Sequence, residues 1–172
     1  MRILTDQEIA AYISEPKVVP NNWYSGLGLK DKSQYQHREK ELEIEGREKN
    51  LFRVIIRQNK LNILDFSIIL TLREKDSNVE YNLLRVNGKH PSRHTNKWEK
   101  ENKLPGHTFW PHFHIHKATQ RYQESGYNID GYAEVTPHYS DFHSALNQFL
   151  LECNFKREDE GQFSLFKGGE TL

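Results

Sequence analysis

Apolar and polar residues alternate through the middle of the chain, in three segments separated by polar turns. Residues 51–58 (LFRVIIRQ), 61–74 (LNILDFSIILTLRE) and 79–88 (VEYNLLRVNG) are rich in β-branched and aromatic residues, which favours consecutive antiparallel strands. In the second segment, apolar residues occupy every other position from Leu64 to Leu72. A period of two places these side chains on one face of a sheet, so we expect one buried face and one accessible face.

Segments with helical periodicity lie on both sides of these strands. Thr5 followed by Glu8 is a capping-box pattern, which predicts a helix over residues 5–14. A second helix is predicted over residues 140–152, with Ser140 as its N-cap and one apolar stripe along its length. We therefore expect an α+β fold, in which a mainly antiparallel sheet of about five strands is packed on one face by the N- and C-terminal helices. The predicted core comprises Leu64, Phe66, Ile68, Leu70, Phe113, Ile115, Leu146 and Phe149.

The remaining segments are more polar. Residues 37–46 (HREKELEIEG) predict a charged edge strand, and residues 89–106 predict a long irregular loop. At 172 residues, the chain is expected to form a single α+β domain over residues 1–155. Residues 156–172 are expected to form a C-terminal extension, with an edge strand at FSLF followed by a disordered tail.

The charge balance limits the kinds of partner that the chain can attract. Lys and Arg number 24, as do Asp and Glu, so the molecule exerts no long-range pull on polyanions or membranes and any affinity for nucleic acid must be local. A single cysteine, Cys153, cannot form an internal disulfide, the N-terminus lacks the apolar core of a signal peptide, and no apolar run approaches membrane-spanning length. We expect a soluble, cytoplasmic protein with no membrane partner.

The most informative motif is a run of alternating histidines. In HTFWPHFHIHKATQRY, residues 107–122, three histidines (His112, His114 and His116) stand two positions apart. If this segment is a strand, their imidazoles line up on one side of the sheet. The plainest interpretation is a solvent-facing polar strand in which histidine tolerates water. Two functional interpretations compete with it.

The first functional interpretation is a metal site. Residues two apart on a strand project neighbouring imidazoles toward one point, as in many zinc sites, so zinc bound by His112, His114 and His116 is an alternative to a protein without cofactors. Three histidines of one strand rarely bind one ion, and the sequence has no cysteine pair. A further ligand would then come from another histidine, among His90, His94, His107, His138 and His143.

The second interpretation is acid–base cleavage of RNA without a metal. This chemistry needs two imidazoles beside one scissile bond and cations that hold the phosphate. Arg53, Arg57 and Arg85 lie on strands predicted to join the same sheet. From residue 85 to residue 103 there are six Lys or Arg against two Glu, with Trp98 among them, a composition suited to binding single-stranded RNA.

A family resemblance points the same way. The segments LLRVNGKHPSRHTN, PHFHIHKATQRY and YAEVTPHYSDFHSALNQFLLECNF, which lie within residues 83–155, resemble uncharacterised bacterial small-protein families with an arginine strand, a His-rich loop, a His-x-His strand and a C-terminal helix. They are also loosely similar to TumE-type toxins of toxin–antitoxin modules. The resemblance implies a ribonuclease-like toxin or defence protein with a cognate antitoxin, in which Arg85, His94 and His114 are the matching positions. The chain departs from that pattern at His116.

Three hypotheses therefore remain. The chain is a metal-independent ribonuclease, a metal-binding protein or metal-dependent hydrolase that uses the same histidines, or a non-enzymatic module that binds another protein. For the ribonuclease, the expected catalytic residues are His114, His112, His116 and His94, and the expected phosphate-binding residues are Arg85, Arg53 and Arg57.

Overall fold

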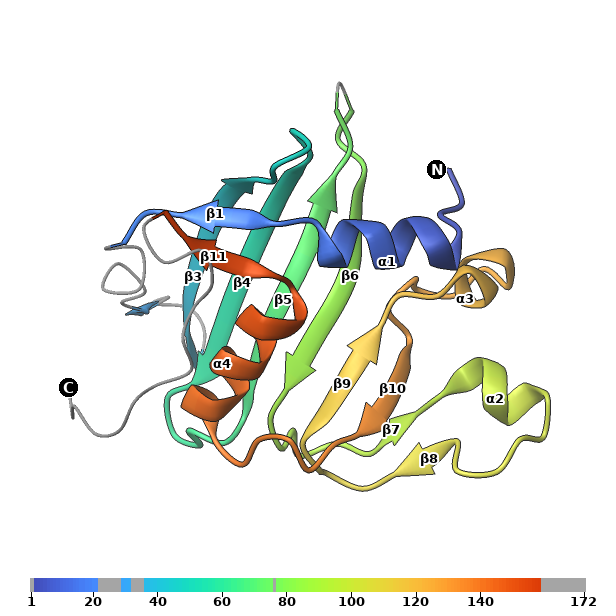
Figure 1. Ribbon diagram of the computed structural model, residues 1–172. Coiled ribbons are helices and arrows are strands. Elements are labelled where there is room, and N and C mark those ends of the chain that lie inside the picture. The colour runs from blue at the N-terminus through green and yellow to red at the C-terminus, as the bar shows by residue number, and fades with distance from the viewer. Residues whose placement is uncertain (1, 22–28, 32–35, 76, 159–172) are drawn as a thin grey trace.

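The structure, a computed structural model, describes residues 2–21, 29–31, 36–75 and 77–158. Within them, seven strands form one antiparallel sheet in the order β10-β9-β6-β5-β4-β3-β2 (Figure 1). The predicted α+β class is confirmed, with short strands at both edges of the sheet. The strands of this sheet are β2 (Lys30–Asp31), β3 (His37–Glu45), β4 (Leu51–Asn59), β5 (Phe66–Arg73), β6 (Glu80–Asn87), β9 (His114–Lys117) and β10 (Tyr132–Val135).

One face of the sheet carries the apolar core. In β5, the alternate residues Phe66, Ile68 and Leu70 are at most 1% exposed, as the period of two predicts. The prediction was wrong for Leu64, which is partly exposed and stands outside the core cluster. The chain turns before β5, where the amide of Asp65 donates to the carbonyl of Asn62, so the strand begins at Phe66 rather than at residue 61.

The opposite face is less accessible than predicted. Ile69 is 5% exposed and Thr71 is 1% exposed, although both point away from the core. Pairing places Ile69 between Ile55 and Arg85, and further arginines flank it on β4. The aliphatic stems of long charged side chains cover apolar neighbours. This face of the sheet therefore presents polar groups to solvent, while the arginine side chains cover the residues beneath them.

The helices α1 (Asp6–Ser14) and α4 (Phe142–Glu152) pack on the core face (Figure 1). The capping box at α1 is confirmed, since Thr5 and Glu8 exchange both hydrogen bonds. At α4 the prediction of the N-cap was wrong. Asp141 caps this helix in place of Ser140, because its carboxylate accepts from the backbone amide of Ser144 at 2.8 Å.

Two short strands join the ends of these helices. β1 (Lys17–Val19) pairs in parallel with β11 (Phe155–Arg157), a pairing that the sequence pattern did not indicate. β11 crosses the boundary expected near residue 155. The edge strand predicted at FSLF and the tail after it lie outside the described residues.

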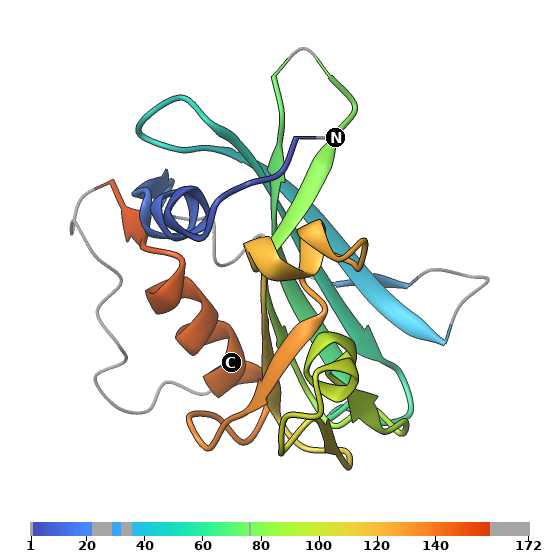
Figure 2. The same cartoon turned by 90° about the vertical axis from the view of Figure 1, so that its right-hand side faces the viewer.

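Residues 88–113, which we call the excursion, connect β6 to β9. Residues 89–106 of the excursion were predicted as an irregular loop, but the excursion contains β7 (His94–Thr95), α2 (Lys97–Glu101) and β8 (Thr108–Phe109), and β7 pairs with β8. Figure 2 shows α2 on the side of the sheet opposite α4. α3 (Gln120–Glu124) follows β9. None of the described helices is long and apolar enough to cross a membrane.

Two polar contacts hold the excursion against the sheet. The buried side-chain amide of Asn96 donates to the carbonyl of Ala133 and accepts from its amide, each at 2.8 Å. Glu99 of α2 accepts a hydrogen bond from the hydroxyl of Tyr122 in α3 at 2.6 Å. The excursion is therefore an ordered cover over the β6–β9–β10 end of the sheet.

Candidate active site

The pairing of β6 with β9 assembles the candidate site. Arg85 lies opposite His116, and Asn87 lies opposite His114. All four side chains belong to the face away from α4, whereas Ile115, between the two histidines, is part of the core. The alternation predicted from the histidine run is therefore present within β9.

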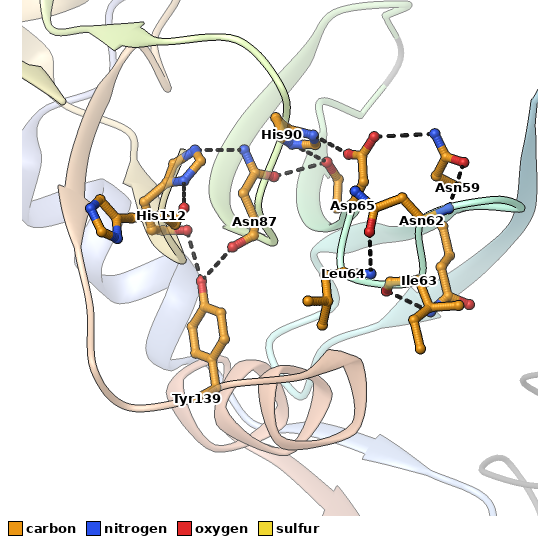
Figure 3. Close-up of polar contacts among 12 residues, drawn as sticks. Asn59, Asn62, Ile63, Leu64, Asp65, Asn87, His90, His112 and Tyr139 are labelled. Atoms are coloured by element: carbon orange, nitrogen blue, oxygen red, sulfur yellow. Dashed lines mark hydrogen bonds and ion pairs between the residues drawn. The ribbon is translucent and has the colours of Figure 1, made fainter. Parts of the chain in front are cut away.

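His112 does not belong to this arrangement. β9 begins at His114, so the period of two does not extend back to residue 112. The His112 side chain is exposed, and Figure 3 shows its ring directed away from Asn87 and His90. Its carbonyl oxygen contributes instead, because it accepts a hydrogen bond from Nδ1 of His114 at 2.6 Å.

The histidines line a cavity of about 430 Å³ beneath the excursion. The ring of His94 lies 4.8 Å from that of His116 and 5.8 Å from that of His114, between ring centroids. The interpretation as a solvent-facing strand is wrong for His114 and His116, because each is only 4% exposed under the excursion. His90, from the start of the excursion, is the fourth histidine of the cavity, with its ring 6.0 Å from His114.

His114 has both ring nitrogens engaged. Nδ1 donates to the carbonyl of His112, so in the neutral ring Nε2 accepts from the Asn87 amide at 3.1 Å. The hydroxyl of Tyr139 lies 2.8 Å from the His114 carbonyl and 3.0 Å from that of Asn87, which fixes the two strands in register (Figure 3). Burial lowers the pKa of His114 to about 4. This residue is a neutral, immobilised imidazole.

His116 keeps one nitrogen open to the cavity. Nδ1 lies 2.9 Å from the carbonyl of Asp130 and 3.3 Å from Nη2 of Arg85. A carbonyl only accepts, so Nδ1 donates to it and the neutral ring carries its lone pair on Nε2. Among the described residues, no group hydrogen-bonds to that nitrogen. Burial, followed by the charge of Arg85, lowers the pKa of His116 to about 2.

His94 interacts with the side chain of Asn96 and with the backbone of Gly131. The amide of Asn96 is oriented by its two bonds to Ala133, so its oxygen accepts from Nε2 of His94 at 2.9 Å. The neutral ring therefore carries its lone pair on Nδ1. Burial lowers the pKa of His94, and the hydrogen bond to Asn96 partly offsets that effect. His94 is half-buried and is less perturbed than the two histidines of β9.

The cations of the cavity come from two elements. Arg85 of β6 lies 3.0 Å from the buried carboxylate of Asp130, but neither Oδ2 of Asp130 nor Nε of Arg85 makes a hydrogen bond. Arg93 and Lys97 of the excursion also line the cavity, and both are exposed. The guanidinium of Arg85 therefore retains donor capacity for an anion.

The structure does not bring Arg53 and Arg57 to this cavity. Both lie on the same face of the sheet, but Arg53 pairs with Glu41 and Glu80, and Arg57 pairs with Glu39 at 2.7 Å. These acidic neighbours neutralise the two arginines locally. Of the expected phosphate-binding residues, only Arg85 meets the histidines.

The sequence analysis did not assign a second set of residues to the site for RNA cleavage. Nδ1 of His90 is bonded to Asp65, Nε2 of His90 lies 3.4 Å from the hydroxyl of Ser67, and that hydroxyl donates to Asn87 at 2.8 Å. Asn59 bonds the other carboxylate oxygen of Asp65 at 3.2 Å (Figure 3). A continuous chain of hydrogen bonds thus runs from Asp65 to His114. His90 has no periodic neighbours in the sequence, so only its position in a basic, His-rich loop drew attention to it.

The described part of the chain contains no group of three or more His, Cys, Asp or Glu side chains arranged to hold a metal ion. Of the three expected ligands, His114 has hydrogen bonds at both ring nitrogens and His112 does not line the cavity. Comparison with protein-family models, curated proteins and solved structures gives no match to this chain. The chemistry of the cavity is therefore the basis for a functional proposal.

Proposed function

We propose that this chain is a metal-independent ribonuclease that cleaves single-stranded RNA within the cavity under the excursion. The observation that carries the proposal is the meeting of Arg85, His94 and His116 in one cavity, although they come from three separate elements. An arginine that binds a phosphate, beside imidazoles that can take up a proton, satisfies the needs of RNA transesterification. The attacking group is then the 2′-hydroxyl of the RNA itself.

We assign the general base to His94. Both His94 and His116 line the cavity, but the pKa of His116 is lowered to about 2, which makes it a much weaker base than His94. His116 instead offers Nε2 as a hydrogen-bond acceptor for the same hydroxyl. Binding of a phosphate anion at Arg85 would favour protonation of the neighbouring imidazoles. The negative charge of the phosphate offsets the positive charge of Arg85, which opposes that protonation.

Three cations at the cavity support the proposed binding of a polyanion by a chain without net charge. Arg85 lies inside the cavity, and Arg93 and Lys97 lie exposed at its lining. The ring of Trp110, which is 69% exposed, lies 5.7 Å from the Arg93 guanidinium and offers a surface on which a base can stack. A ribonuclease activity is compatible with a toxin or defence role in which an antitoxin is the partner. That role is implied by the family resemblance alone.

The test uses a DNA oligonucleotide that contains one ribonucleotide. The expected result is cleavage at that position in the presence of EDTA, with a 2′,3′-cyclic phosphate on one product. Arg85→Lys should lower kcat/KM by about tenfold or more, because lysine cannot make a bidentate contact with phosphate. The matched control is Arg73→Lys, an exposed, ion-paired arginine of β5 outside the cavity.

Two outcomes contradict the proposal. Absence of cleavage by the unaltered protein would end the ribonuclease interpretation. Cleavage that EDTA abolishes and zinc restores would transfer the histidines to the metal-dependent alternative.

A further inference from the structure

We propose that His90 is the general acid of this site, held in position by Asp65. This inference rests on the proposed ribonuclease function and adds the group that protonates the leaving oxygen. It concerns residues outside the histidine run, and its basis is the direction of the hydrogen bonds that link Asp65 to His114.

The direction of that chain follows from its far end. Nδ1 of His114 must donate to the carbonyl of His112, so Nε2 accepts and the side-chain nitrogen of Asn87 faces it. The oxygen of Asn87 therefore faces Ser67 and accepts from its hydroxyl at 2.8 Å.

The near end then determines the state of His90. The hydroxyl of Ser67 has given its only proton to Asn87, so it can only accept from Nε2 of His90. A carboxylate also only accepts, so Nδ1 of His90 donates to Asp65. Since both ring nitrogens face acceptors, the proposed acid is a His90 imidazolium paired with Asp65.

The charge next to the His90 ring differs from the charges next to the other three histidines of the cavity. Asp65, from the turn before β5, is the anion against the His90 ring, whereas burial, followed by nearby positive charges that include Arg85, lowers the pKa of His94, His114 and His116. Arg57 and His37 line a neighbouring pocket of about 210 Å³ with His90 and Asp65. A cavity that holds one charged and several neutral imidazoles has an acid and a base ready for separate roles.

The geometry leaves the acidic proton transferable. Nε2 of His90 lies 3.4 Å from Ser67, at the outer limit of a hydrogen bond, so a substrate oxygen can replace that partner. His90 lines the same cavity as His94 and has a side chain that is 30% exposed. Asn59 fixes the second oxygen of Asp65 and thereby the orientation of the ring.

The reaction balances with these two histidines. His94 takes the proton of the 2′-hydroxyl, the 2′-oxygen forms a bond to phosphorus, and the bond from phosphorus to the 5′-oxygen breaks. The 5′-oxygen leaves with the proton from Nε2 of His90. The products are a 2′,3′-cyclic phosphate and a 5′-hydroxyl, with His94 protonated and His90 neutral. When the cyclic phosphate is hydrolysed, His90 takes a proton from the attacking water and His94 gives its proton to the departing 2′-oxygen, so both residues return to their starting states.

The test compares two leaving groups. A dinucleotide releases a poor alkoxide that needs a proton, whereas a ribonucleoside 3′-(4-nitrophenyl phosphate) releases a stable phenolate that does not. His90→Gln should lower the rate on the dinucleotide by about a hundredfold or more, but the rate on the aryl ester by less than about tenfold. Asp65→Asn should show the same split at smaller size, as expected of a positioning residue. The control, His138→Gln, changes an exposed histidine outside the cavity and should leave both rates unaltered.

Each other outcome overturns a different claim. If His90→Gln lowers both rates equally, His90 is not the acid, while the ribonuclease function stands. If Ser67→Ala abolishes both rates, Ser67 is a nucleophile activated by His90 and the acid assignment is wrong. If the unaltered protein cleaves neither substrate, the ribonuclease function fails and the acid role fails with it.

Discussion

Two buried polar sites on opposite sides of the sheet satisfy their hydrogen bonds in different ways. On the core side, the ammonium of Lys17 is fully buried and lies 2.9–3.1 Å from four backbone carbonyl oxygens, at the ends of α1 and α4. On the other side, within the described residues, the histidine cavity leaves Nε2 of His116 and Nε of Arg85 without a hydrogen bond.

The difference in hydrogen bonding indicates a structural role for Lys17 and a ligand-binding role for the histidine cavity. Buried polar groups in folded proteins nearly always have partners, and those that lack them call for an explanation. Lys17 uses all of its donors to satisfy carbonyls that the helix ends leave unpaired. The cavity keeps one imidazole acceptor and one donor of the Arg85 guanidinium without hydrogen bonds, which costs stability and suits the binding of a ligand that supplies the missing partners.

The largest effect is expected at Lys17. Lys17→Met should lower the free energy of unfolding by about 3 kcal/mol or more, because it leaves several buried carbonyls without a donor. Urea denaturation measures this loss. Lys100→Met, at an exposed position of α2, is the control and should change stability by less than about 0.5 kcal/mol. If both variants are equally stable, the Lys17 site is not a structural anchor.

The opposite pattern is expected at His94. His94→Gln should lower the rate of RNA cleavage by about a hundredfold, equivalent to about 2.7 kcal/mol of activation free energy, through loss of the general base. Its free energy of unfolding should change by less than about 1 kcal/mol, because the ring is half-buried and its removal leaves no buried charge. Parallel measurements of cleavage and urea unfolding decide the matter. A variant that loses stability and activity together would remove the contrast between the two sites.

The two sites should also affect stability in different pH ranges. Folding lowers the pKa values of His114 and His116 from about 6.5 to about 4 and about 2, respectively. Below pH 6.5 the unfolded chain therefore binds more protons than the folded chain. The contribution of these two histidines to the free energy of unfolding is fully present above pH 6.5. It falls as the pH drops, by up to about 1.4 kcal/mol per pH unit for each imidazole. Urea denaturation at pH 7.5, 6 and 5 should show this decline. His116→Asn should make it shallower, and an unchanged slope would mean that His116 does not titrate as the burial requires.

Lys17 should act in the alkaline range. Burial lowers its pKa from 10.5 to about 8, so between these values the unfolded chain again binds the extra proton. This group therefore increases stability as the pH rises from about 8 to 10.5. The increase should be absent in Lys17→Met, as measured by urea denaturation at pH 7.5 and 9.5. An identical alkaline increase in the variant would assign the effect to other groups.

The smallest effect is expected at His112. His112→Ala should leave the cleavage rate within about twofold and the free energy of unfolding within about 0.5 kcal/mol, because only the backbone carbonyl of this residue contacts the site. The same assays apply. A large loss of activity would show that the exposed ring reaches the substrate and that the site extends beyond the cavity.

Local signals in the sequence predicted local structure well. The capping box of Thr5 and Glu8, the alternation in β5 and the His-x-His pair of β9 all depend on neighbouring residues, and all are present. The errors at Leu64 and His112 share a cause. A period of two shows which residues share a face, but it does not show where the strand begins.

Contacts between distant segments were not accessible in the same way. Arg53 and Arg57 were assigned to the correct strand, yet only the pairing of β3 with β4 reveals the acidic residues that neutralise them. His90 meets Asp65 across 25 positions, from a loop without periodicity. The excursion looked irregular because its order comes from Asn96 and Glu99, single polar residues whose partners lie 37 and 23 positions away. Candidate residues could thus be named from the sequence, but not the set that meets.

The position of Asn96 has a consequence for the behaviour of the protein in a crowded solution. β10 ends the sheet, and an unpaired edge strand can recruit a strand from another molecule and so begin aggregation. By occupying both the amide and the carbonyl of Ala133, the Asn96 side chain imitates the next strand without offering a new edge beyond it. The same residue accepts a hydrogen bond from His94, so its bond to the edge also fixes the proposed base. Breaking the bonds of Asn96 would expose this edge and release the ring of His94, so the cover over the edge strand and the position of this histidine depend on one amide.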